Sequence, residues 1–267
     1  MTQSSDDVPS EYQDILDELE SNTKVLQPPQ YSGVLRLSIR ENIFRKVVGT
    51  HEEILQTPAI KVVIVKSAPI SRTYYKGEYV AGQSNSPACW SADSETGRPS
   101  KEVPEDTRQA SACFECKQNI KGSGVGQTRA CRYQQRIAVL LADEDDKINP
   151  AEVYQLQLPA TSLFGKDKQK MSMQTYARFL NSQEKPVPFA MLLTEIRFDE
   201  ESHTPKLYFK PLRVLEEAEA AIAKEIQTHP DTEKLVTLKI APTQDSYPNV
   251  DNVFGVVEGD GVYVRNL

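Results

Sequence analysis

Long apolar runs are missing from this sequence, and no stretch approaches the roughly 18 consecutive apolar residues that a membrane-spanning helix requires. The N-terminus, MTQSSDDVPSEYQDILDELE, is acidic, whereas a signal peptide is basic and then apolar. We therefore expect no membrane association and a soluble protein that stays in the compartment where it is made.

Cysteine is scarce as well. Four cysteines among 267 residues are too few and too clustered for a secreted disulfide framework, which favours a reducing cytosol and metal-bound thiolates. A hydrophobic content of 39% and a charged content of 26% exclude collagen-like, prion-like and wholly disordered proteins. A chain of this length can bury a sizeable core without a partner.

The sequence also lacks a recognisable catalytic set: we find no nucleophile elbow, HExxH motif, paired acidic metal ligands or Cys/His pair. The glycine-rich segment 117–129 is not a Walker A loop, because Gln127 follows its last glycine where lysine is required. The acidic run 143–146 has oxygen ligands for magnesium, but consecutive carboxylates in a turn are usually a solvated loop. We expect a protein that is not an enzyme.

Positive charge is scarce at both ends of the chain but not in its middle. The net charge is −7, yet residues 1–30 carry −6 and residues 214–267 another −6, so residues 31–213 carry +5. The stretch 108–136 alone holds six basic residues and one acid. A basic middle with acidic ends is typical of a polyanion binder whose tails shield it or recruit partners. An ordinary mixed-charge surface is the alternative.

The pattern along the chain predicts an α+β protein built on a mostly antiparallel sheet or a partly closed, OB-like barrel. Residues 1–30 are predicted to be a flexible acidic arm with one short helix at 10–20, residues 31–213 a β-rich core, and residues 214–267 an acidic helix and tail. Two or three helices are expected, including 172–181 and 216–227. Alternating or β-branched residues predict strands at 33–39, 43–48, 60–65, 72–80, 136–142, 153–158, 190–198 and 206–211.

Residues 81–131 have no periodicity, and an irregular segment of about fifty residues needs something else to order it. The pattern C-x23-C-x2-C-x14-C formed by Cys89, Cys113, Cys116 and Cys131 predicts one structural zinc ion, because two residues between thiolates let both reach a tetrahedral metal. Four thiolates fill the coordination shell and leave no position for a substrate. Bare buried thiols and an iron–sulfur cluster are the alternatives. The histidines at 51, 203 and 229 lie outside this pattern.

Basic and aromatic residues alternate in and around the same segment. Unpaired bases stack on aromatic rings while cations follow the phosphates, so this mixture predicts binding of single-stranded nucleic acid. We expect the interface to contain Arg72, Tyr74, Lys76, Tyr79, Trp90, Arg108, Lys117, Lys121, Arg129, Arg132, Tyr133 and Arg136. Core packing is the alternative for these rings and the favoured one for Tyr75 and Phe114. The glycines at 122, 124 and 126 either bring backbone N–H groups close to a phosphate or form a tight turn.

Several motifs over residues 31–213 resemble a family of tailed-bacteriophage proteins associated with single-stranded DNA binding. They are Ile70-Ser-Arg-Thr-Tyr-Tyr75, Cys89-Trp-Ser-Ala-Asp93, Cys113-x-x-Cys116-x-Gln-Asn-Ile-Lys-Gly-Ser-Gly124, Arg129-Ala-Cys-Arg-Tyr-Gln-Gln-Arg-Ile-Ala-Val139 and Leu158-Pro-Ala-Thr-Ser-Leu-Phe164. The resemblance implies a phage protein that acts in the cytoplasm of the infected bacterium, and it places no contact residue.

A known kind of phage single-strand binder inserts a zinc site into an oligonucleotide-binding barrel, which is similar in outline to a barrel-like sheet interrupted at 81–131. Such proteins commonly end in a strongly acidic tail, whereas this chain ends VYVRNL. Any acidic recruiting segment is therefore expected at 1–20 or 216–227. We predict a single-stranded DNA-binding protein of phage DNA replication or recombination; the alternative is a protein-interaction factor, such as a phage RNA polymerase cofactor or a virion component.

Overall fold

The structure is a computed structural model that describes residues 34–77, 86–238, 240, 254–255 and 264–265. The arm 1–30, the helix expected at 10–20, Tyr79 and most of the chain after residue 240 lie outside the described residues. Within the described part, the prediction of an α+β protein with a mostly antiparallel sheet is confirmed.

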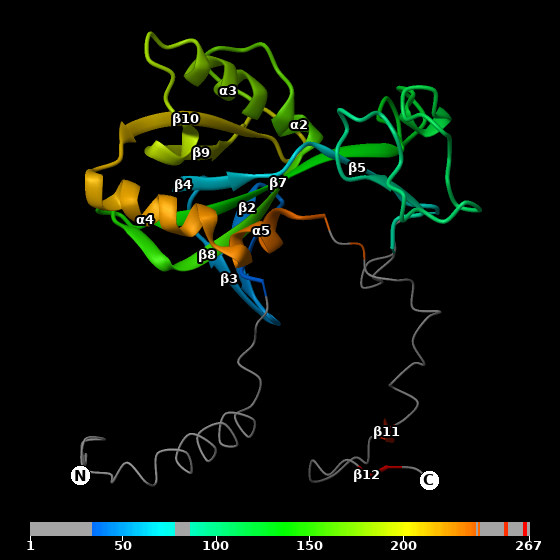
Figure 1. The fold of residues 1–267 in the computed structure, drawn as a ribbon, viewed down its shortest axis with the longest axis horizontal. Helices are drawn as coiled ribbons and strands as arrows, with labels where there is room; N and C mark the ends of the chain where they lie inside the picture. Colours follow the sequence, from blue (N-terminus) through cyan, green and yellow to red (C-terminus); the bar gives the residue numbers. More distant parts are fainter. Residues whose placement is uncertain (1–33, 78–85, 239, 241–253, 256–263, 266–267) are drawn as a thin grey trace, which may run out of the picture.

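One ten-stranded sheet forms the centre of the molecule (Figure 1). Its main path runs β10-β9-β4-β7-β8-β1-β2-β3, and β5 and β6 extend it beside β7. The strands are β1 (Arg36–Arg40), β2 (Ile43–Val48), β3 (His51–Leu55), β4 (Ala59–Ser67), β5 (Ser71–Tyr74), β6 (Cys89–Ser91), β7 (Cys131–Ala142), β8 (Ile148–Pro159), β9 (Leu192–Phe198) and β10 (Leu207–Val214). A separate pair joins β11 (Phe254–Gly255) to β12 (Val264–Arg265).

The sheet does not close, so the expected barrel is not found: β10 and β3 lie at opposite ends of the strand path. Among the described strands, β1 and β8 form the one parallel pair, and this contact joins residues more than a hundred positions apart. Strand β7 begins at Cys131, five residues before the predicted start. The first residues of β7 are mostly polar, so no apolar pattern marks the start of the strand in the sequence.

Helices cover both faces of the sheet (Figure 1). They are α2 (Ala160–Leu163), α3 (Met173–Asn181), α4 (Glu217–Thr228) and α5 (Pro230–Val236), with short 3-10 turns η3 (Lys117–Asn119) and η4 (Phe189–Met191). The two predicted helices are α3 and α4. Ser172 caps α3 by accepting the N–H of Thr175, and Glu216 and Glu219 form a capping box on α4.

Alternation along the central strands divides the core into two layers. In β4, Val62 and Ile64 pack with α2 and α3, whereas Val63 and Val65 pack with α4 and α5. In β7, Ile137 and Val139 face the first layer, and Ala138 and Leu140 face the second. The sheet is therefore buried on both sides. Odd-numbered residues of β7 face the layer with α2 and α3, and even-numbered residues face the layer with α4 and α5.

The insertion, which we define as residues 86–130, projects from the end of the sheet formed by β5 and the start of β7 (Figure 1). It contains one short strand, β6, and one turn, η3. It has a small apolar cluster of its own, in which Trp90 and Val103 pack against Tyr74, Leu238 and Ile240. The two large clusters of the core contain no residue of the insertion.

Candidate metal centre and nucleic-acid interface

Strand register places two of the four cysteines on one face. Tyr74 in β5 is the partner of Cys89 in β6 and also of Cys131 in β7. Residues paired across neighbouring strands share a face, so both sulfurs leave the sheet on the side of α2 and α3. Cys113 and Cys116 approach from the insertion. Their turn is held by Asn119, whose side-chain Nδ2 donates to Cys113 O at 2.9 Å and whose N–H donates to Cys116 O at 2.9 Å.

All four cysteines line one small cavity of about 20 Å³. A space of this size holds one water molecule or one ion. Among the described residues, the side chains of His, Cys, Asp and Glu form no group of three or more that could hold a metal ion. The four cysteines therefore line one cavity, but their separations are not those of metal ligands, and zinc binding stays a prediction.

Burial dominates the acid–base chemistry of these thiols. It raises the pKa of Cys89 and of Cys113, and it raises the pKa of Cys131 to about 12. Neighbouring cysteines add to each of these increases, whereas Arg72 opposes them at Cys113 and Cys131. The N–H groups of Gln109 and Trp90 hydrogen-bond to the sulfur of Cys89. Without a metal, the thiols of Cys89, Cys113 and Cys131 therefore favour the protonated form, with a guanidinium beside them.

Arg72 lies between this cavity and a second, more open one. Its Nε and Nη1 are buried and have no hydrogen-bond partner among the residues that the structure describes, and Nη2 donates to Ser94 O at 3.4 Å. The guanidinium lies over the ring of Tyr133, 4.5 Å from its centre. Burying N–H donors of a charged group without acceptors costs free energy, so this arrangement favours an additional negative charge close by. Four thiolates around a divalent metal carry such a charge.

The second cavity, which we call the junction cleft, has a volume of about 370 Å³ and lies where the insertion meets β7, α2 and α3. Its polar and aromatic residues are Arg72, Ser94, Glu95, Arg129, Tyr133, Phe164 and Gln174. Tyr133 and Phe164 pack edge to face with ring centres 5.5 Å apart. Sequence reasoning missed Phe164 and Gln174, because only the tertiary fold brings α2 and α3 next to the insertion.

The glycine-rich segment forms a tight turn. The N–H groups of Gly122 and Gly124 both donate to Thr128 O, at 2.9 and 3.1 Å, so neither is directed at a phosphate. Gly122 and Gly126 have φ values of +89° and +62°, which favour glycine. Arg129 Nε donates to Asn119 O at 2.8 Å and ties the turn to η3. Of the two readings of these glycines, the structure favours the turn.

The basic residues of the insertion face solvent. Arg108, Lys117, Lys121 and Arg129 are exposed, and none forms an ion pair with a described acidic residue. Several cations of the core, in contrast, have carboxylate partners: Lys61, Lys66, Lys170, Lys206, Arg197 and Arg213. The insertion as a whole has a net charge of zero, because its six basic residues are matched in number by Asp93, Glu95, Glu102, Glu105, Asp106 and Glu115. The four exposed basic residues without carboxylate partners are nevertheless grouped at 108–129.

The structure does not bring every predicted contact residue to this surface. Arg132 is exposed but lies on the opposite face of β7 from Tyr133, on the side of α5. Arg136 lies on that side too, where Nη1 donates to Thr237 O at 2.7 Å and burial lowers its pKa. Lys76 is exposed next to the undescribed residues 78–85. The predicted set therefore splits between two faces of β7.

The exposure of the aromatic residues differs most from what the sequence predicted. Trp90 was expected to offer a stacking surface, but it is only 9% exposed because Leu238 and Ile240 cover it. Tyr74 is half-buried in the same cluster. Conversely, Tyr75 and Phe114, for which core packing was favoured, are 45% and 75% exposed. Within an aperiodic loop the sequence offers no signal for which ring is buried.

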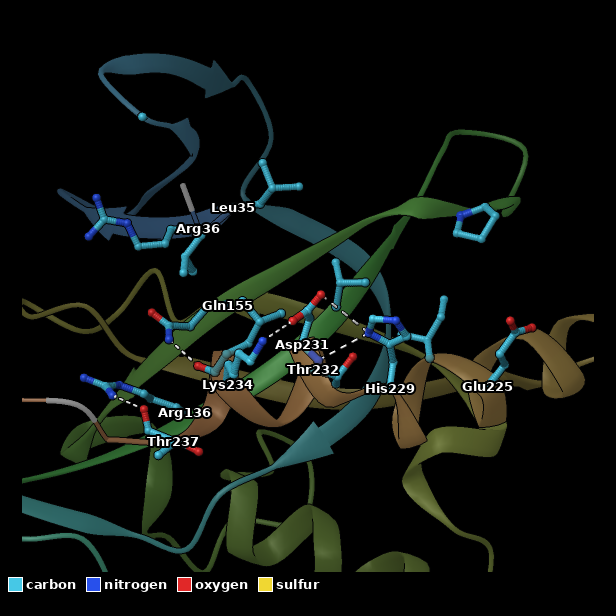
Figure 2. A pocket seen from close by; sticks show the side chains of 16 residues that line it. Leu35, Arg36, Arg136, Gln155, Glu225, His229, Asp231, Thr232, Lys234 and Thr237 are labelled. Carbon is cyan, nitrogen blue, oxygen red and sulfur yellow. Dashed lines mark hydrogen bonds and ion pairs between the residues drawn. The ribbon is translucent and has the colours of Figure 1, made fainter. Parts of the chain in front are cut away.

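A third cavity, of about 950 Å³, is a groove between β1, β8 and the helices α4 and α5 (Figure 2). Figure 2 shows that most of its polar groups are already engaged: Lys234 pairs with Asp231 at 2.6 Å, and Gln155 bonds to the backbone of Leu235. The bond from Gln155 in β8 holds α5 on the sheet, whereas Lys234 and Asp231 both lie in α5. The charges of the groove are of both signs, so it does not continue the basic surface.

Comparisons with known proteins add no assignment. No protein-family model matches the chain, and neither the curated proteins nor the solved structures give a significant match. None of the helices in the described residues is long and apolar enough to cross a membrane.

Proposed function

We propose that this protein binds single-stranded DNA through the exposed cations of the insertion. One observation carries the proposal: the exposed Arg108, Lys117, Lys121 and Arg129 of the insertion lack carboxylate partners among the described residues. Free lysines and arginines attract phosphates and release the counterions that DNA holds. The resemblance of the sequence motifs to tailed-phage proteins supports a role in phage DNA replication or recombination in the host cytoplasm.

In this proposal the four cysteines hold one structural zinc ion that fixes the insertion. The donor set supports this, because four thiols around an ion-sized cavity are typical ligands of structural zinc. The buried, unpartnered Nε and Nη1 of Arg72 support it too, since a zinc tetrathiolate supplies the missing negative charge. We place no substrate at the metal, and the proposed function involves no catalysis.

Salt-dependent binding tests the proposal directly. Affinity for a labelled single-stranded oligonucleotide should fall steeply between about 50 and 200 mM salt, and double-stranded DNA should bind more weakly. The double variant Lys117→Glu/Lys121→Glu should weaken binding for all sequences and reduce the salt slope by at least about 2. A wild-type protein that binds no single-stranded DNA at low salt would refute the proposal.

Lys147→Glu is the matched control. Lys147 lies in the turn between β7 and β8, at the other end of a twelve-residue strand from Cys131. At about 3.3 Å per residue this is far outside the insertion, so reversing one charge there should leave affinity within about twofold, whereas Lys121→Glu alone should weaken binding more. Equal losses in the control and in the double variant would show that only net charge matters.

The alternative function, docking on another protein, has one observation in its favour. Phe114, Ile120 and Val125 of the insertion are 75%, 58% and 86% exposed. A contact made mainly by such side chains should be insensitive to salt. Phe114→Ala separates the readings in a pull-down with phage or host RNA polymerase at high salt, where DNA binding is suppressed.

A further inference from the structure

The junction cleft has features that the binding of phosphates alone does not explain. At about 370 Å³ it falls at the small end of the range of roughly 300–1,000 Å³ typical of small-ligand pockets. It combines two guanidiniums, two aromatic rings, a carboxylate and an amide from four different parts of the fold. Rings with polar groups at their edge are typical of sites for planar heterocycles.

We propose that the junction cleft binds one unstacked nucleobase, with Phe164 as the stacking surface and Glu95 and Gln174 at the polar edge of the base. This inference rests on the proposed function, because the base belongs to the single strand that the insertion binds. It adds a subsite where the insertion meets the main body of the protein, away from Lys117 and Lys121.

Phe164 is the ring available for stacking. One face of Tyr133 is covered by the guanidinium of Arg72, 4.5 Å from the ring centre. Phe164 packs against Tyr133 with the ring planes 87° apart and is still 43% exposed. Perpendicular packing of this kind fixes the ring and leaves part of its surface in solvent.

The backbone around Phe164 is held before any ligand arrives. Leu163, the preceding residue, is fully buried. The carbonyl of Gly165 accepts hydrogen bonds from Thr175 Oγ1 at 2.7 Å and from Arg178 Nη2 at 3.1 Å. A pre-ordered ring loses little conformational entropy when a base stacks on it, so more of the stacking energy appears as affinity.

Glu95 indicates that a base, not a phosphate, enters the cleft. A carboxylate repels phosphate oxygens but accepts hydrogen bonds from amino groups on the edges of cytosine, adenine and guanine. The amide of Gln174 both donates and accepts. Thymine has no exocyclic amino group, so the cleft should prefer cytosine over thymine.

Arg129 connects the cleft to the basic surface. It lines the cleft, and its Nε is bonded to Asn119 O between Lys117 and Lys121 in the sequence. A strand whose phosphates follow Lys117 and Lys121 thus reaches the cleft at Arg129. There, one base turns away from its neighbours and stacks on Phe164.

The test measures the affinity of the full-length protein for labelled oligo(dC), oligo(dT) and an abasic strand of equal length, each of about 20 nucleotides. Wild type should prefer dC over dT, and the abasic strand should bind most weakly. Phe164→Ala and Phe164→Leu should each lower affinity about fivefold to a hundredfold and leave the salt slope unchanged, because they remove stacking without removing charge. Glu95→Gln should reduce the preference for dC.

Phe179→Ala is the matched control, because Phe179 is 39% exposed on α3 and does not line the cleft. Thermal unfolding of each variant identifies any loss of fold, and the leucine variant retains an apolar side chain at 164. If wild type binds no DNA, the proposed function fails and this inference fails with it. If wild type binds with a steep salt slope and both Phe164 variants match it, the cleft inference alone is overturned.

Discussion

Arg72 has three roles that depend on its position between two cavities. Its guanidinium faces Cys113 and Cys131, covers one side of Tyr133 and forms a wall of the junction cleft. Its buried Nε and Nη1 lack acceptors among the residues that the structure describes. Sequence analysis assigned this residue to the nucleic-acid interface, whereas its contacts indicate a role in supporting the cysteine cluster and the ring of Tyr133.

Arg72→Met is expected to weaken zinc binding about 10- to 100-fold, because a residue that supports a metal site from its second shell typically contributes this much. The loss should follow from removing the positive charge beside the thiolates. Competition with a chromogenic zinc chelator measures it. Arg98→Met, at an exposed arginine of the same insertion, is the control. Equal zinc affinity in wild type and Arg72→Met would contradict the role given to Arg72.

Gly124 is required by space rather than by its backbone angle. A Cβ atom at this position would lie 2.7 Å from Thr128 Oγ1, 2.9 Å from the carbonyl carbon of Arg129 and 3.0 Å from the nitrogen of Ala130. Two of these atoms belong to the backbone and cannot rotate away. At Gly126 a Cβ meets nothing within 4 Å, and the cost there comes only from φ at +62°.

Gly124→Ala should therefore destabilise the turn by about 1–3 kcal/mol, and Gly126→Ala by about 1 kcal/mol. Hydrogen exchange of peptides from residues 117–131 measures the difference locally, and oligonucleotide affinity should fall in the same order. Equal exchange rates in the two variants would show that the turn accommodates a side chain at 124.

At the scale of elements, the hairpin of β9 and β10 is joined to the segment before α3 by a buried carboxylate. Asp199 is 4% exposed and accepts hydrogen bonds from Lys170 Nζ and Lys206 Nζ, each at 2.7 Å. These two lysines lower the pKa of Asp199 to about 2. Because the folded pKa lies below the ordinary value, the interaction stabilises the protein above pH about 4 and is lost as pH falls toward 2.

Asp199→Asn should lower the free energy of unfolding at neutral pH by about 1–2 kcal/mol, after allowance for solvent screening of the partly exposed lysines. The difference from wild type should shrink between pH about 4 and 2, where the wild-type carboxylate becomes protonated. Denaturant unfolding at several pH values measures both effects. Asp145→Asn, at a side chain that is 79% exposed, should have little effect at any pH. A difference that does not vary with pH would mean that charge is not the cause.

For the molecule as a whole, periodicity revealed the strands and helices better than it revealed the site. The strand predicted at 60–65 and the helix at 172–181 correspond to β4 and α3, because each has a regular apolar pattern. The parallel pairing of β1 with β8 left no local signal, since it depends on contacts distant in sequence. Candidate cations were found by composition, but their division between two faces of β7 depends on strand register.

The same limit applies to the aromatic residues. Trp90 is buried by residues that follow α5, nearly 150 positions later, and Phe164 approaches Tyr133 only through the position of α2. Neither contact can be inferred from the residues around it. The cysteine spacing predicted a common cluster, and the structure does place all four around one cavity, while their metal stays a prediction.

The insertion can be regarded as a long loop in a hairpin that is already in register. Tyr74 at the end of β5 and Cys131 at the start of β7 are paired, so the two strands are correctly spaced for a short turn. Replacing residues 75–130 by Asn-Gly, with Cys131→Ser, should therefore give a folded sheet. The two large core clusters contain no residue of this segment.

The shortened protein should unfold cooperatively, with a loss of a few kcal/mol because Thr73, Leu238 and Ile240 lose their cover. It should hold no zinc and show no salt-dependent binding of single-stranded DNA, since it lacks the cysteines and the exposed cations of the insertion. Circular dichroism, denaturant unfolding and oligonucleotide titration test these expectations together. A folded protein that still binds DNA with a steep salt slope would place the interface on the main body, whereas a chain that cannot fold would show that the insertion is part of the core.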